Sequence, residues 1–548
     1  MKSLYLITFS LVIILTPTVP FAQNITKENI ENAENIIDLQ FTDAERDSML
    51  QSLEDQKVNY KKIREVELKN SVPPSILFNP IPVGFTFPKE QNPIKFSDYS
   101  NTRMPANKNE LAFFTIGQLA ELIKTKQITS MELTKFFIER LKKYDPALHC
   151  AITLTEERAM HHAKIADEEI AAGKYRGILH GIPFGVKDLL ATKDFKTTWG
   201  SVPFKDQMID EDATVIIKLE EAGAVLVAKL TMGELAWGDV WFGGKTRNPW
   251  DTANGSSGSS AGSAASVSAG LIPFAIGTET YGSIISPSTV CGTTGLRPTY
   301  GTVSRTGVMA LSWSMDKIGP ICRSAEDLAI IFNAIYGLDG LDQTLYDVPF
   351  NYQPSINIKG LKIGYLKKDF DKKYDFHKND SITLAKLKEL GAELISIELP
   401  DYPINDLAIM LSAEAGAAFD ELSRSNKDDL MVRQIKNAWP NSFRASRFIP
   451  AVEYINASRV RTLLIQGMQK LMSIIDFYVA PSWEGDNNLL TNLTGHPCVV
   501  LPNGFSDNGT PTSITFIGRL FDEGRLIAFA KLYQDTTDFH KKHPPLFK

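Results

Sequence analysis

Residues 254–288 form the part of the chain richest in side chains that could do chemistry. Ten of these 35 residues are serine and six are glycine, yet apolar stretches such as LIPFAIGT run through the segment. A flexible linker would lack those stretches, and a P-loop would carry a lysine directly after its glycines. Small residues let a substrate approach the backbone closely, and hydroxyl groups can act as nucleophiles or relay protons. The segment therefore favours a catalytic serine.

A serine nucleophile needs a base, which is most often histidine. Of the eight histidines in the chain, none lies in the G-x-S-x-G setting of a nucleophile elbow. Lys187 lies in the apolar run GIPFGVKDLL, where burial would lower its pKa and allow it to act as a base. A surface ion pair between Lys187 and Asp188 is the alternative that these residues leave open.

The composition limits the classes of protein that the chain can belong to. Its 548 residues are 43% hydrophobic and 22% charged, with a formal net charge of −6, which is typical of a large globular protein. No blocks of basic residues are present, so we expect no nucleic-acid partner. The chain also lacks H-E-x-x-H and, apart from the adjacent His161 and His162, paired-histidine ligand spacing, so we predict neither a metal nor another cofactor.

The N-terminus predicts export. Lys2 precedes an apolar run of about a dozen residues, and the small residue Ala22 precedes Gln23, a pattern typical of a signal peptide over residues 1–22. The run is shorter than the roughly 20 residues that a membrane-spanning helix needs. We therefore expect a periplasmic or extracellular protein that is not stably inserted in a membrane.

The four cysteines leave their redox state open. In an oxidising compartment they could pair in three ways, but their apolar neighbours favour buried free thiols. These residues are Cys150, Cys291, Cys322 and Cys498.

Residues 23–108 differ in character from the rest. Thr42 and Glu45 form a capping-box pattern that predicts a helix reaching about Leu68. Five prolines between positions 73 and 88 then predict an extended segment. We interpret residues 23–108 as a helical and proline-rich N-terminal extension, and residues 109–548 as one large domain.

The large domain shows the pattern of an α/β fold. Capping boxes at Thr115 and Thr129 predict the starts of two helices, the second ending at Pro146. Two distant segments, DATVIIKLEEAGAVLVAKL and SITLAKLKELGAELISIEL, each read as a helix, a glycine and a strand. Such units predict a β-sheet covered by α-helices.

The order of several motifs resembles the amidase signature family. They are GIPFGVKD, GSSAGSAASVSAGLIP, GTETYGSIISPSTVCGTTGLRPTYGTVSR, DKIGPICRS, AVEYINASRVR and LTGHPCVVLPNGF. The resemblance covers roughly residues 111 to 540. It implies an amidase signature fold with a mixed sheet, and hydrolysis of carboxamides through an acyl-enzyme by a Ser-cisSer-Lys triad. By position, Ser283 would be the nucleophile, Ser259 the bridging serine after a cis peptide bond, and Lys187 the base.

The resemblance also implies an oxyanion hole of backbone N–H groups at Thr280, Tyr281 and Gly282. Tyr281 replaces a residue that is often glycine, and would be strained if its position required a positive φ. Ile285 stands where many members carry arginine, a feature that resembles the peptide-amidase-like branch. We expect three further serines to cap the helix that follows, namely Ser256, Ser260 and Ser263.

We therefore predict a secreted amidohydrolase that acts on peptide amides or other small neutral amides, as a monomer or homodimer. Trp237 and Asp239, just before the serine-rich segment, are candidates for substrate binding. The alternatives are the glutaminase subunit of an amidotransferase and a non-catalytic binding protein on the same fold.

Overall fold

The computed structural model describes residues 24–547. Their contacts divide them into two compact units, which separate between Lys69 and Asn70. The predicted signal peptide lies outside the described residues. None of the helices between residues 24 and 547 is both long and apolar enough to cross a membrane.

The first unit consists of helices α1 (Lys27–Ile37) and α2 (Asp43–Arg64). The predicted capping box is confirmed, because the Thr42 hydroxyl accepts from the N–H of Glu45 and the Glu45 carboxylate accepts from the N–H of Thr42. An ion pair of 2.8 Å between Arg46 Nε and Glu34 Oε1 joins the two helices.

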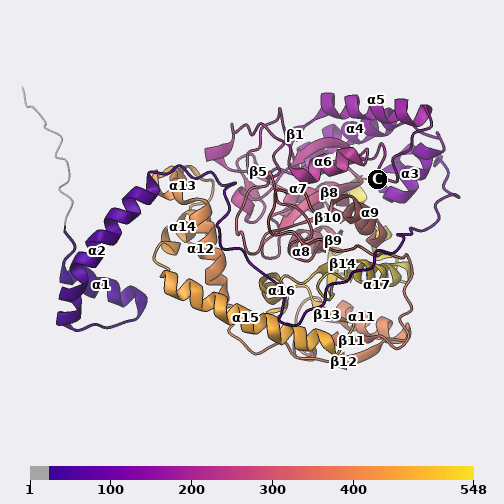
Figure 1. The fold of residues 1–548 in the computed structure, drawn as a ribbon. Helices are drawn as coiled ribbons and strands as arrows, with labels where there is room; N and C mark the ends of the chain where they lie inside the picture. The colour runs from indigo at the N-terminus through magenta and orange to yellow at the C-terminus, as the bar shows by residue number, and fades with distance from the viewer. Residues whose placement is uncertain (1–23, 548) are drawn as a thin grey trace, which may run out of the picture. The chain divides into compact units, whose positions relative to one another are not determined.

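The second unit is built on a mixed sheet (Figure 1). Within residues 70–547 the sheet has eleven strands, in the order β1-β3-β2-β8-β10-β9-β14-β15-β13-β11-β12. β2 pairs in parallel with β3 and β8, and β11 with β12 and β13, while the other pairs are antiparallel. The strands are β1 (Ala151–Leu154), β2 (Pro183–Lys187), β3 (Val225–Leu230), β8 (Phe274–Glu279), β9 (Thr294–Arg297), β10 (Lys317–Cys322), β11 (Lys362–Tyr365), β12 (Glu393–Ser396), β13 (Phe477–Pro481), β14 (Cys498–Phe505) and β15 (Pro511–Ile517). Two small hairpins join β4 (Val240–Trp241) to β5 (Gly244–Lys245) and β6 (Arg247–Asn248) to β7 (Asp251–Gly255).

Helices pack against both faces of the sheet, as alternate residues of β3 show. Val225 and Val227 pack in one core cluster with residues of α4 and α7, whereas Leu226 packs in another with residues of α6, α9 and α17. The helices of this unit are α3 (Ile116–Lys124), α4 (Ser130–Leu148), α5 (Glu156–Ala171), α6 (Thr214–Glu221), α7 (Ala261–Ser268), α8 (Ile285–Cys291), α9 (Ala325–Ile335), α10 (Lys367–Phe370), α11 (His377–Glu389), α12 (Ile409–Ala418), α13 (Asp420–Arg424), α14 (Trp439–Ser446), α15 (Ala451–Ser473), α16 (Asn487–Thr494) and α17 (Glu523–Asp535). The prediction of an α/β fold with helix-covered strands is confirmed.

The structure confirms several sequence signals and corrects one. The capping boxes at Thr115 and Thr129 are present. Both helix-glycine-strand units form, with Gly223 and Gly391 at φ +89° and +102°. The prediction that Pro146 ends α4 is wrong, because the helix continues to Leu148. Pro146 has no N–H to donate, but the N–H of His149 donates to the carbonyl of Asp145 at 2.7 Å and closes the helix beyond the proline.

All four cysteines are buried and free, as their apolar neighbours predicted.

Residues 70–99, here called the strap, have no regular secondary structure and are fixed by contacts to the rest of the second unit (Figure 1, indigo trace). The N–H of Lys95 donates to the carbonyl of Tyr352, and the N–H of Ser97 donates to Glu326. Residues 70–108, which the sequence grouped with the extension, thus belong by their contacts to the second unit.

Candidate active site

Lys187 lies at the last position of β2 and is fully buried. Its Nζ atom lies 2.8 Å from Ser259 Oγ, 2.9 Å from Thr278 Oγ1 and 3.2 Å from Ser260 Oγ. The surface ion pair with Asp188 that the sequence left open does not form, because Asp188 instead pairs with Lys229 at 3.0 Å. Lys187 is therefore surrounded by hydroxyl groups and has no carboxylate bonded to it within residues 24–547.

Lys187 Nζ can donate to all three hydroxyl groups, as an ammonium would, but the contacts also fit a neutral amine, which has two N–H donors and one lone pair. Ser260 Oγ donates to the carbonyl of Thr278 at 3.1 Å and can accept a hydrogen from Lys187. Thr278 Oγ1 can accept the second hydrogen. The lone pair of Nζ is then left for the O–H of Ser259. This assignment directs the Ser259 proton toward Lys187.

The electrostatics favour the same protonation state. Burial, the largest influence, lowers the pKa of Lys187 from 10.5 to about 7, although the charges of Asp316 and Glu279 act in the opposite direction. Without a bonded carboxylate, the nearby charges offset only part of the cost of removing an ammonium from water. A large fraction of Lys187 is therefore neutral near pH 7.

Ser259 and Ser283 come from two loops that meet beside Lys187. Ser259 precedes α7, Ser283 precedes α8, and the side chains are 1% and 7% exposed. The N–H of Ser260 donates to the carbonyl of Ser283 at 3.2 Å and so holds the two loops together. The peptide bond between Gly258 and Ser259 is cis.

The turn before Ser283 presents backbone donors. Gly282 has φ +82°, whereas Tyr281 is not among the residues with positive φ, so tyrosine causes no strain there. Within residues 24–547, the backbone N–H groups of Tyr281, Gly282 and Ser283 donate to no protein acceptor. Free N–H groups at such a turn can stabilise a negatively charged oxygen.

Glu279 fixes the other side of this turn. One carboxylate oxygen accepts the N–H groups of Ile284 and Ile285 at 2.8 and 2.9 Å. The other accepts from Arg297 at 2.8 Å and from Asn492 at 2.9 Å. Burial raises the pKa of Glu279, but the Arg297 charge and the hydrogen bonds outweigh this and lower it. The buried carboxylate thus fixes the backbone directly after Ser283.

Asp316 holds the start of the same turn. Its carboxylate accepts the hydroxyl of Thr280 and the N–H groups of Leu311 and Ser312, at 2.8 and 2.9 Å for the two backbone donors. Sequence reasoning missed both acids. The available signal was a charged residue at the end of an apolar strand, as in FAIGTE, since a buried charge needs partners.

The two residues predicted to bind substrate, Trp237 and Asp239, are not among the hydrogen-bond partners of Lys187. Asp239 accepts the N–H of Ser257 at 3.3 Å, and the Trp237 ring lies 4.8 Å from the guanidinium of Arg433. Their role in substrate binding stays a prediction.

The expected capping serines behave differently. Ser260 occupies the N-cap position of α7 but makes no side-chain cap, because its hydroxyl binds Thr278 and Lys187. Ser256 and Ser263 donate to the carbonyls of Ser257 and Ile276. The prediction that these serines cap the helix is therefore wrong.

Among the described residues, no group of three or more His, Cys, Asp or Glu side chains is placed to hold a metal ion. A buried amine, two serines on loops that a backbone hydrogen bond joins, and a turn with free N–H groups together form a candidate site of the serine-hydrolase class, with lysine in place of histidine.

Comparisons with known proteins agree with this class. The sequence profile of the Amidase family matches residues 132–487. The chain is 34% identical over 480 residues to a glutamyl-tRNA(Gln) amidotransferase subunit from Coxiella burnetii, covering 79% of this chain and 99% of that one. The chain therefore belongs to the amidase signature family and is an enzyme that hydrolyses amide C–N bonds.

Solved structures give the same result. The peptide amidase of Stenotrophomonas maltophilia superposes with a TM-score of 0.72 at 27% identity, covering 80% of this chain and all of that one. The corresponding glutamyl-tRNA(Gln) amidotransferase subunit from Thermotoga maritima superposes with a TM-score of 0.66 at 26% identity, covering 78% and 95%.

Proposed function

We propose that the enzyme hydrolyses small neutral amides, peptide amides among them, with Ser283 as nucleophile, Ser259 as proton bridge and Lys187 as base. The observation that supports this most is the fully buried Lys187 amine, bonded to hydroxyl groups and aimed at Ser259. In the first step Ser283 Oγ attacks the amide carbon. Its proton passes to Ser259 while the Ser259 proton passes to Lys187.

The backbone turn then stabilises the negative charge on the former carbonyl oxygen. The donors are the free N–H groups of residues 281–283, each worth about 3 kcal/mol in such a position. The proton held by Lys187 returns through Ser259 to the nitrogen of the leaving amine, and the C–N bond breaks. Water next attacks the ester on Ser283 and releases the carboxylic acid.

Ammonia release from purified mature protein tests the proposal, with peptide amides, aryl amides and fatty amides offered in parallel. Turnover of neutral amides together with fluorophosphonate labelling of Ser283 is expected. Labelling that mass spectrometry maps to another residue would redirect the assignment.

A second candidate is glutamine hydrolysis for an amidotransferase, favoured by the 34% identity to the Coxiella burnetii protein. That function predicts turnover of free glutamine, increased by a partner protein. The first proposal predicts activity as a monomer or homodimer. Comparing glutamine with a peptide amide on the isolated chain separates the two.

We also propose export, on the basis of Lys2, the apolar run that follows and Ala22. N-terminal sequencing of the protein from its native cell should give a chain that starts near Gln23. A mature protein that retains residues 1–22 would exclude signal-peptide cleavage.

A further inference from the structure

A cavity of about 410 Å³ lies beside the proposed proton relay. Thr278 and Thr280 line it. Thr278 is bonded to Lys187 through its hydroxyl, and Thr280 begins the turn that leads to Ser283. A substrate group in this cavity would therefore lie next to the reacting carbonyl.

The strap supplies one wall of this cavity through residues 70–77, with Leu77 among the lining side chains. Asn70 pairs with the backbone of Ala310 in both directions. Its amide nitrogen donates to the carbonyl at 2.8 Å, and its amide oxygen accepts from the N–H at 2.7 Å. Ala310 precedes Leu311 and Ser312, whose N–H groups bind Asp316. The wall is thus linked to the turn that carries Ser283.

The wall is also fixed just after Leu77. The ring of Phe78 lies 3.4 Å from the guanidinium carbon of the buried Arg461 and edge-on to Tyr300, with ring centroids 5.0 Å apart. Contacts of Asn70 and Phe78 thus anchor the two ends of the segment, while Leu77 itself is 39% exposed and lines the cavity. The strap can therefore act as a wall, anchored at both ends, that selects substrates by shape.

The charges around the cavity disfavour an anionic substrate. The two cationic lining residues are engaged: Arg305 bonds to Asp342, Thr344 and the carbonyl of Trp313, and Lys317 to the carbonyl of Met315. The carboxylates of Glu211 and Asp316 also line the cavity. A carboxylate entering here would meet negative charge without a free cation to pair with.

We propose that strap residues 70–77 form a specificity-determining wall, so that the cavity takes an apolar, uncharged acyl group of the amide substrate and disfavours one that carries a carboxylate. This inference rests on the proposed function, since it assigns the acyl side of the same site. It concerns a part of the chain that precedes the region matched by the family profile.

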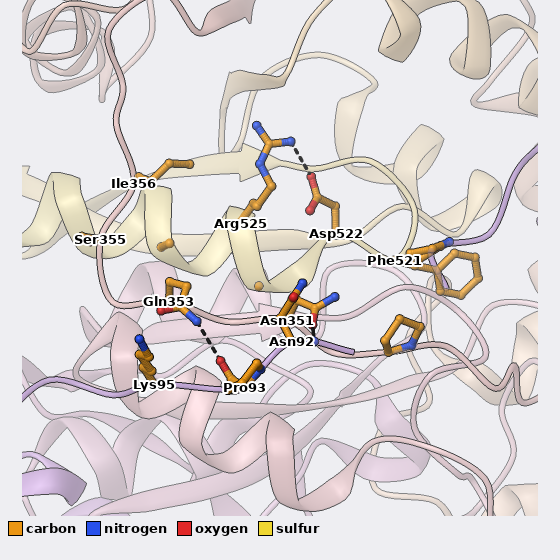
Figure 2. A pocket seen from close by; sticks show the side chains of 14 residues that line it. Asn92, Pro93, Lys95, Asn351, Gln353, Ser355, Ile356, Phe521, Asp522 and Arg525 are labelled. Carbon is orange, nitrogen blue, oxygen red and sulfur yellow. Dashed lines mark hydrogen bonds and ion pairs between the residues drawn. The ribbon is translucent and has the colours of Figure 1, made fainter. Parts of the chain in front are cut away.

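The other end of the strap offers a matched control. A second pocket of about 660 Å³ lies at that end. In this pocket Gln353 donates to the carbonyl of Pro93 at 2.8 Å, the hydrogen bond drawn as a dashed line in Figure 2. None of its lining residues bonds to Lys187, Ser259 or Ser283. Gln353→Ala therefore removes a strap contact without touching the cavity near the relay.

The test compares kcat/KM for 3-phenylpropanamide and propanamide in the wild type, Leu77→Trp, Leu77→Ala and Gln353→Ala. Leu77→Trp should fill the cavity and lower the ratio of bulky to small amide at least about tenfold. Leu77→Ala should lower it less, by removing an apolar contact. The control, Gln353→Ala, should leave the ratio of kcat/KM for the bulky amide to that for the small amide unchanged.

The charge preference is tested on the wild type with methyl succinamate and succinamate, which differ in one negative charge. The ester should be preferred at least about tenfold. Equal rates for the pair, or an unchanged bulky-to-small ratio in both Leu77 variants, overturn the proposal. If Leu77→Trp does not fold, the Leu77→Ala ratio decides. If the wild type hydrolyses neither these four amides nor any peptide amide, the proposed function fails instead.

Discussion

Two buried lysines on neighbouring strands have opposite surroundings. Lys187 on β2 pairs in register with Leu230, and Lys229 on β3 pairs with Val186. Both side chains are fully buried. Lys229 forms an ion pair of 3.0 Å with Asp188 and donates to the carbonyl of Lys196 at 2.8 Å. Lys187 instead contacts three hydroxyl groups and the carbonyl of Thr278.

The difference shows that burial alone does not make a lysine a base. Burial lowers the pKa of Lys229, although the charge of the adjacent Asp188 carboxylate and its hydrogen bond act in the opposite direction. Lys187 has no such partner, so desolvation is less opposed. One lysine can accept a proton and the other holds the loop after β2 in place. Substitution of Lys187 should therefore lower activity, whereas substitution of Lys229 should lower stability.

The largest loss of activity should come from Ser283→Ala, which removes the hydroxyl group that Lys187 deprotonates through Ser259. We expect kcat/KM to fall by at least about 10⁴-fold, because the acyl-enzyme ester cannot form without the Ser283 hydroxyl. Ammonia release from a preparation freed of contaminating wild type measures this. Near-normal activity would show that Lys187 and Ser259 serve a different nucleophile.

Lys187→Met and Ser259→Ala should each lower kcat/KM by about 10³-fold or more. The double variant should be little worse than either alone, because both residues act in one relay. Thermal unfolding serves as the control, and Lys187→Met should lower stability by about 1–3 kcal/mol, because methionine fills a similar volume but leaves the buried hydroxyl groups without the amine. Fully additive losses would mean that the two residues act independently.

Lys229→Met should instead lower stability and leave most of the activity. It leaves the Asp188 carboxylate buried and unpaired, so we expect the free energy of unfolding to fall by about 3–5 kcal/mol, as measured by urea unfolding. Adding Asp188→Asn should restore part of this loss. The folded protein should keep most of its activity. A large fall in kcat without loss of stability would mean that Lys229, too, takes part in catalysis.

Trp237→Ala should have the smallest effect, since its ring contacts Arg433 and not the relay. If the predicted substrate role holds, the relative rates across the amide panel change by about three- to tenfold while the relay remains intact. Unchanged relative rates with altered thermal stability would leave Trp237 a packing residue.

Much of the site follows from local patterns in the sequence. The apolar run around Lys187 favoured a buried amine, with a surface ion pair to Asp188 left open, and the serine-rich segment predicted hydroxyl groups in the site. The capping boxes at Thr42, Thr115 and Thr129 were readable because their hydrogen bonds span only three residues.

The rest depends on contacts between distant segments. Ser260 looked like a helix cap, and only the approach of β8 brings Thr278 within reach of its hydroxyl. Glu279 and Arg297 are 18 residues apart, and their pairing depends on the sheet order. The strap showed only its prolines in the sequence, because its partners, such as Ala310, lie more than two hundred residues away.

The pH dependence of kcat/KM tests most directly whether neutral Lys187 is the base. The pKa of Lys187 is lowered from 10.5 to about 7, and only the neutral form can accept the Ser259 proton. Activity should therefore fall as the pH drops through about 7 and level off above about 8. A profile that stays flat from about pH 5.5 to 9, with chemistry rate-limiting, would contradict the account, as would a limb that disappears when one of the histidines is substituted.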